Sequence, residues 1–263
     1  MFQYSFWQWV LFFDIYCFAG WCIESAIVSF NTRRPVNRGF LRGPFLPIYG
    51  FGAVIILWST LPVEDHPTLV FLCGMLGATV LEYVTGWLME ALFKTKYWDY
   101  SHKRIQLHGR ICLTSSIFWG ILALVLTYVL HKPVEQLVLS VNTNGLIVAD
   151  VAVFLFLAVD LFYAVRSALD IRRLLDSITR LREELTELKS ALTERVESNE
   201  HVAAMLAHRD ALKEEYTAQF TRLTVFAKGF LKNNPTAHSR RFNETLAELR
   251  DKLAAQRSEK RKK

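Results

Sequence analysis

The chain has 263 residues, of which 52% are hydrophobic and 21% charged, with a mean hydropathy of +0.19 and a formal net charge of +6. Residues 1–166 contain 11 Lys or Arg and 10 Asp or Glu, whereas residues 167–263 contain 20 and 15. This uneven distribution excludes a single soluble globule and a disordered chain. It predicts a membrane part followed by a water-exposed part.

Five apolar stretches occur in the first part, and a helix of about 20 residues is needed to cross a hydrocarbon core of about 30 Å. They lie near residues 6–29, 44–61, 67–91, 111–130 and 145–165. The second stretch is the shortest, and Pro44 and Pro47 at its start predict a broken or re-entrant entry. We therefore expect an all-α fold, with a five-span transmembrane helical bundle over residues 1–166.

The segments between these stretches alternate in charge. Segments 31–43 and 92–110 are rich in Lys and Arg, as is the chain after Arg166, whereas segment 62–66 is acidic and segment 131–144 is balanced. Basic segments stay on the cytoplasmic side of a membrane. The pattern predicts a multi-pass protein of the inner (cytoplasmic) membrane, with the N-terminus outside and the C-terminus in the cytoplasm.

A short motif occurs twice. The pattern Gly-Trp-x-x-Glu occupies residues 20–24 at the end of the first stretch and residues 86–90 at the end of the third. We interpret it as an internal parallel repeat of a two-helix unit. Trp and Glu three residues apart share a helix face, so the two copies could meet around a polar site. The candidate residues of this site are Trp21, Glu24, Glu82, Trp87 and Glu90.

Acidic residues occur within the apolar stretches, where an ionised acid costs about 2.5–3.5 kcal/mol at mid-bilayer. They are Asp14, Glu24, Glu82, Glu90, Asp150 and Asp160. Three interpretations stay open: the acids bind a cation, they hold protons, or they pair with basic residues. For Asp160, one such partner would be Arg166.

The basic loops carry a second candidate set. Residues 37–50 contain several Gly and Pro residues, which favour a defined backbone path, and Arg side chains there suit lipid phosphates, anionic ligands or a partner's acids. The candidate contacts at the cytoplasmic mouth are Asn37, Arg38, Arg42, Asp99 and Arg110. No motif predicts a metal site or a cofactor, and His108 lacks a second ligand at a diagnostic spacing.

Several longer motifs accompany these residues. They are Gly-Trp-x-x-Glu at 20–24, Asn-Arg-Gly-Phe-Leu-x-Gly-Pro at 37–44, Pro-Ile-Tyr-Gly at 47–50, Glu90, Trp-Asp-Tyr-Ser at 98–101 and Gly-Arg-Ile at 109–111. In these motifs, residues 12–165 resemble the bacterial ABC-transporter type IV (CmpB-like) permease family of polytopic membrane proteins. The resemblance implies Asn at the position of His108. It carries over no substrate and no catalytic residue.

The water-exposed part begins with a heptad pattern, which predicts a cytoplasmic coiled-coil stalk over residues 167–225. The seam would contain Ile171, Leu174, Ile178, Leu181, Leu185, Leu188, Leu192 and Asn199. We expect a homo-oligomer through residues 171–206. The alternative is an intramolecular hairpin, in which the stalk folds back on a helix near 239–257.

Residues 226–263 are expected to form a short helix and a basic tail. We interpret the tail as solvated, with contact to a membrane or a nucleic acid as the lesser alternative. The chain lacks the Gly-x-x-x-x-Gly-Lys-Ser/Thr motif of ATPases, so a separate ATPase or another cytoplasmic partner would be needed for transport. Membrane lipid is the other expected partner.

Three functions follow from these patterns. The leading one is a permease-like membrane component with a polar intramembrane site and an unknown substrate. The alternative is a membrane-anchored oligomeric scaffold or regulator that acts through its coiled coil. The third is an intramembrane enzyme acting on a phosphorylated lipid, with Asp99 or Glu24 as base. The sequence favours a non-enzyme and identifies no catalytic residue.

Overall fold

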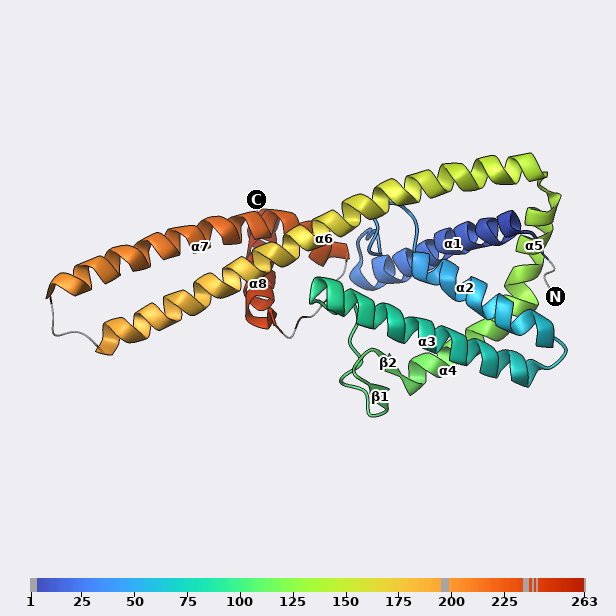
Figure 1. Cartoon of the computed structure of the whole chain (residues 1–263), viewed down its shortest axis with the longest axis horizontal. Helices are drawn as coiled ribbons and strands as arrows, with labels where there is room; N and C mark the ends of the chain where they lie inside the picture. Colours follow the sequence, from blue (N-terminus) through green and yellow to red (C-terminus); the bar gives the residue numbers. More distant parts are fainter. Residues whose placement is uncertain (1–3, 195–198, 234–236, 238, 240, 263) are drawn as a thin grey trace. The chain divides into compact units, whose positions relative to one another are not determined.

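The computed structural model of the chain describes residues 4–194, 199–233, 237, 239 and 241–262 (Figure 1). Helices make up most of this described part, which confirms the all-α fold. The chain divides into two compact units. The first comprises Met1–Leu92 and Lys96–Val165, and the second comprises Phe93–Thr95 and Arg166–Lys263.

The first unit is a helical bundle with one small hairpin. Its elements are α1 (Phe6–Thr32), α2 (Pro47–Thr60), the 3-10 turn η1 (Leu61–Val63), α3 (Pro67–Phe93), β1 (Gln106–Leu107), β2 (Ile111–Cys112), α4 (Leu113–Val125), the π-helical turn η2 (Leu126–Leu130), α5 (His131–Ser140) and the first part of α6 (Thr143–Glu194). The strands β1 and β2 pair antiparallel. The hairpin therefore connects α3 to α4.

Four helical segments are long and apolar enough to cross a membrane. They are Phe6–Thr32, Pro67–Phe93, Leu113–Ser140 and Thr143–Leu192, while Pro47–Val63 is a shorter apolar helix. Large apolar side chains are exposed along these helices; Val80 is 62% and Phe154 is 68% exposed. Such continuous apolar faces are costly in water and suit lipid. The first unit is that of a membrane protein.

The ends and contacts of α1 follow from local sequence. Ser5 caps its N-terminus in a capping box with Gln8, which satisfies two free backbone N–H groups. Glycines let α1 and α2 approach closely, since a Cβ on Gly20 would overlap the ring of Tyr49. Small residues at such contacts favour helix packing in membranes. The close contact places the start of α2 against the middle of α1.

The second unit is formed by the later part of α6, α7 (Asn199–Asn233) and α8 (Asn243–Lys262). These helices share one apolar core, made of Ile171, Leu175, Ile178, Phe220, Leu223, Ala227, Leu231, Phe242, Leu246, Leu249 and Leu253. Helix α7 returns along α6 (Figure 1). The region 167–225 therefore contains two helices that pack against each other, whereas the alternative expected from the sequence was a stalk folded back on a helix near 239–257. Helix α8 lies in that later region and joins the same core.

The predicted seam residues divide between this core and the surface. Ile171, Ile178 and Leu181 are buried within the chain, and Leu174 packs beside the core. Leu185, Leu188 and Leu192 are half-buried. Asn199 begins α7, and its side chain lies outside the described residues. Association of two chains through this seam stays a prediction.

Candidate functional site

Glu82 lies on α3 within a hydrogen-bonded cluster and is 5% exposed. Its Oε2 accepts hydrogen bonds from Ser115 Oγ at 2.7 Å and Trp119 Nε1 at 3.0 Å. Its Oε1 accepts one from the Tyr100 hydroxyl at 3.1 Å. Ser115 and Trp119 are four residues apart on α4 and therefore share a face. The three donors offset part of the desolvation of a buried carboxylate.

Glu24 lies near the end of α1 and has two partners. Its Oε1 accepts a hydrogen bond from the Tyr49 hydroxyl at 2.8 Å, and its Oε2 is 3.8 Å from Arg38 Nε. The ring of Tyr49 packs edge-to-face on Trp119, with 6.2 Å between centroids. Because Trp119 also donates to Glu82, two aromatic side chains connect Glu24 with Glu82.

The loop between α1 and α2 is held by the first Gly-Trp-x-x-Glu motif. Trp21 Nε1 donates to Asn37 Oδ1 at 2.6 Å, and Asn37 Nδ2 donates to the carbonyl of Arg42 at 2.6 Å. Ser25 Oγ accepts a hydrogen bond from the backbone N–H of Arg38 at 3.1 Å. These contacts position Arg38 beside Glu24, so Trp21 and Asn37 organise the loop.

Asp160 on α6 fixes the other end of this loop. Its carboxylate accepts hydrogen bonds from the backbone N–H groups of Arg42 at 3.2 Å and Gly43 at 2.8 Å. The Arg42 guanidinium lies 5.9 Å from the centroid of the Tyr163 ring. The sequence suggested Arg166 as a partner of Asp160. In the structure the Asp160 carboxylate instead accepts hydrogen bonds from backbone N–H groups of the loop. A carboxylate that accepts two backbone N–H groups is well compensated.

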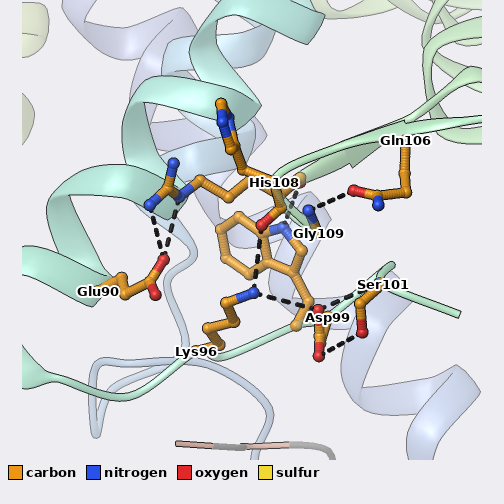
Figure 2. A network of polar contacts seen from close by, with 9 residues as sticks. Glu90, Lys96, Asp99, Ser101, Gln106, His108 and Gly109 are labelled. Carbon is orange, nitrogen blue, oxygen red and sulfur yellow. Dashed lines mark hydrogen bonds and ion pairs between the residues drawn. The ribbon is translucent and has the colours of Figure 1, made fainter. Parts of the chain in front are cut away.

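Glu90 near the end of α3 pairs with Arg110. Its Oε2 accepts hydrogen bonds from Arg110 Nε at 3.1 Å and Nη2 at 2.8 Å (Figure 2). The guanidinium also lies over the Tyr83 ring at 5.4 Å and donates to the Tyr83 hydroxyl at 3.3 Å. That hydroxyl is 3.0 Å from His108 Nδ1. His108 thus takes part in a side-chain network with Tyr83 and Arg110.

Asp99 organises the turn that carries Arg110. Figure 2 shows its carboxylate accepting hydrogen bonds from Ser101 N at 3.1 Å, Ser101 Oγ at 2.9 Å and Lys96 Nζ at 3.3 Å. Burial raises the pKa of Asp99, but these bonds and the Lys96 charge outweigh it, so its pKa lies below the usual value. A general base needs a pKa near the working pH. The geometry favours a structural role for Asp99.

The second Gly-Trp-x-x-Glu motif is arranged differently from the first. Trp87 is 53% exposed, whereas Trp21 binds the loop. Trp98 packs beside Gly86, since a Cβ added to that glycine would lie 3.2 Å from the Trp98 ring. Trp98 Nε1 donates to the carbonyl of Arg110 at 2.8 Å. The two motifs therefore organise their loops through different tryptophans.

The predicted site residues form two groups. Glu24 and Glu90 each have an arginine of their own, Arg38 and Arg110. The contacts of Tyr49 and Trp119 connect Glu24 to Glu82, whereas the sequence predicted that Glu24 and Glu90 meet. Four residues of this connection were missed in the sequence: Tyr49, Tyr100, Ser115 and Trp119. Ser115 and Trp119 gave a weak signal, because both can form hydrogen bonds and they share a face of an apolar helix.

The fold and these contacts can be compared with known proteins. No curated protein and no solved structure matches the chain. Residues 11–165 match the family described as "Putative ABC-transporter type IV". The matched segment covers more than half of the chain and contains both Gly-Trp-x-x-Glu motifs, both basic loops and the Glu82 cluster. The chain belongs to this family.

Proposed function

We propose that the protein is the membrane-embedded component of a transport system. The observation that carries this proposal is Glu82, a buried carboxylate held by three donors inside an apolar bundle and connected through Trp119 and Tyr49 to Glu24. Buried ionisable groups in membrane helices commonly line substrate or ion pathways. Glu24 and Glu82 are the proposed polar site.

Arg38, Arg42 and Arg110 belong to the basic loops and form the proposed cytoplasmic mouth. The positive-inside rule places these loops in the cytoplasm. There they could meet an ATPase encoded elsewhere, because the chain lacks the phosphate-binding motif of an ATPase. Family membership supports such a partner. Five crossings would require α2 and η1 to span the membrane as the shortest element.

Complementation of a deletion strain tests the site. Metabolite profiles of cells and medium are compared for the deletion strain carrying the wild type, Glu24→Gln, Glu82→Gln or the control Asp65→Asn, whose side chain is exposed. We expect the two glutamine variants to reproduce the deletion profile at normal membrane abundance, and the control to restore the wild-type profile. Full restoration by Glu82→Gln would reject the site.

A membrane-anchored scaffold is the second candidate. The observation that favours it is the separate apolar core of the second unit, which gives the cytoplasmic part a stable surface of its own. Deleting residues 171–263 separates the two functions. A scaffold loses its whole phenotype on truncation, whereas a transport component retains part of it. The abundance of the truncated protein in the membrane is the control.

A further inference from the structure

Asp14 on α1 and Asp150 on α6 are two buried acids outside the polar site. Asp14 is 6% and Asp150 is 1% exposed. Asp14 Oδ2 and both carboxylate oxygens of Asp150 have no hydrogen-bond partner among the described residues. These oxygens differ from those of Glu82 and Asp160, which accept hydrogen bonds from several donors. An ionised acid in this setting would be uncompensated.

Asp14 and Asp150 lie on membrane-spanning-length helices of the same unit, close enough for a Coulombic interaction between their carboxyl groups. Helices α1 and α6 begin at the same end of the first unit (Figure 1). At 1.5 Å per residue, Asp14 and Asp150 lie about 12 Å and 10 Å beyond the first residue of their helices. Both are therefore at a similar depth.

Among the described residues, no Lys, Arg or His forms an ion pair with Asp14 or Asp150. On α1, the Cys17 thiol is the titratable group on which Asp14 acts. On α2, Tyr49 is bonded to Glu24. On α5, His131 is held by the hydroxyls of Tyr4 and Tyr16, each at 3.1 Å, and Tyr4 donates to Glu135. On α6, Asp160 is bonded to loop amides.

We propose that Asp14 and Asp150 form a binding site for an exchangeable proton. Two carboxyl groups that repel each other and have three oxygens without donors are stabilised when at least one is protonated, because protonation removes a charge and creates a donor. A metal cation fits the site less well. Na⁺ and Ca²⁺ need several oxygen ligands, and the described residues contain no group of three or more His, Cys, Asp or Glu that could hold a metal.

Infrared spectroscopy of the full chain in lipid nanodiscs tests the proposal directly. A protonated carboxyl group has a C=O stretch that is separate from carboxylate bands and shifts in D₂O. We expect this band in the wild type at neutral pH, with loss of most of its intensity in Asp14→Asn and Asp150→Asn. The matched control Asp65→Asn, an exposed acid, should leave the band unchanged. Absence of the band, or its persistence in the double variant, would overturn the proposal.

Two further measurements complete the test. If Na⁺ added at neutral pH abolishes the band while K⁺ does not, a metal cation occupies the site and the proposal fails. Thermal unfolding gives an independent readout, since asparagine cannot ionise. We expect the wild type to lose thermal stability as the pH rises above the ordinary Asp pKa of about 3.9, because the unfolded chain releases these protons there and the folded chain retains them. Asp14→Asn/Asp150→Asn should lose less. Equal losses would contradict a proton at this site. Neither measurement depends on transport activity.

Discussion

At the scale of single residues, the turn before Arg110 is set by backbone conformation. His108 and Gly109 both have positive φ, at 54° and 70°, and the Arg110 N–H donates to the Leu107 carbonyl at 3.0 Å. His108 and Gly109 are therefore the central residues of a β-turn from Leu107 to Arg110, and turns with positive φ at both central positions favour Asn and Gly. The resemblance implied Asn at position 108, and the turn gives a conformational reason for it.

The first prediction concerns Gly109. A Cβ there would overlap Asp99 Oδ1 and would lie 2.9 Å from Lys96 Nζ, and a non-glycine residue with positive φ costs about 1–2 kcal/mol. We expect Gly109→Ala to lower the midpoint of thermal unfolding in detergent. His108→Asn is the matched control and should unfold at or above the wild-type temperature. A wild-type midpoint for Gly109→Ala would show that the turn can rearrange.

The second prediction concerns the pH dependence of Asp99. Its pKa is lowered in the folded protein, so its contribution is present above the ordinary Asp pKa of about 3.9 and is lost as the pH falls through the lowered value. Hydrogen bonds to a charged group contribute about 1.5–3 kcal/mol. We expect Asp99→Asn to lower thermal stability at neutral pH, and the difference from wild type to shrink on acidification. A difference that is constant with pH would exclude the ionised carboxylate as its cause.

The hydrogen-bond partners of Glu82 could not be predicted from the sequence. The acid itself was identifiable, because a carboxylate inside an apolar stretch is rare. Its donors come from α4 and from the loop after α3, and their meeting depends on how these elements pack. Local periodicity contains no information on that packing. For the same reason, the sequence did not predict that Trp98, and not Trp87, holds the second loop.

At the scale of elements, hydropathy located the helices well and their ends less well. Stretch 6–29 corresponds to α1 and stretch 67–91 to α3. The stretch predicted to end at residue 130 continues through η2 and α5 to Ser140. Pro133 lies in the first turn of α5, where a missing N–H is tolerated, and the π-helical turn precedes it. Composition alone predicted that the apolar stretch ends at residue 130.

The stalk shows how one heptad pattern fits two arrangements. A two-stranded seam uses positions a and d, which include Leu174. In the structure α6 buries Leu175 together with the seam residues Ile171, Ile178 and Leu181, while Leu174 is only partly buried. This wider apolar face fits packing against both α7 and α8. Both arrangements bury Ile171 and Ile178. The choice depends on α8, which lies far away in the sequence.

The third prediction tests this helical core. Leu223 on α7 is fully buried, and truncation of a buried leucine to alanine costs about 2–5 kcal/mol. We expect Leu223→Ala to destabilise the second unit, detected as faster proteolysis of the region after α6 in the full chain. Leu188→Ala, which changes a half-buried residue of the predicted seam, is the control and should be cleaved near the wild-type rate. If only Leu188→Ala accelerated cleavage, the oligomeric seam would be the stabilising contact.

At the scale of the whole molecule, the cytoplasmic position of the basic loops is a prediction of the positive-inside rule. Within the first unit, the basic loops are joined to helix ends by Glu24, Glu90 and Asp160. All three acids therefore serve the face that the positive-inside rule assigns to the cytoplasm. The orphaned pair of Asp14 and Asp150 belongs to helix regions near the opposite end. Asp14 and Asp150 thus differ from these three acids, because the oxygens named above have no donor among the described residues.

The last prediction concerns the course of the chain through the membrane. If α2 crosses, the segment around Asp65 is outside while the hairpin around Lys103 and the chain after α6 are inside. We expect reporters inserted singly into the full chain to show this alternation: an alkaline phosphatase is active at 65, and a fluorescent protein folds at 103 and after residue 263. A cytoplasmic reporter signal at 65 would mean that α2 is re-entrant. Since η1 extends α2 only to Val63, about 25 Å of helix at 1.5 Å per residue, the outcome decides whether this short element spans a membrane by local thinning or turns back within it.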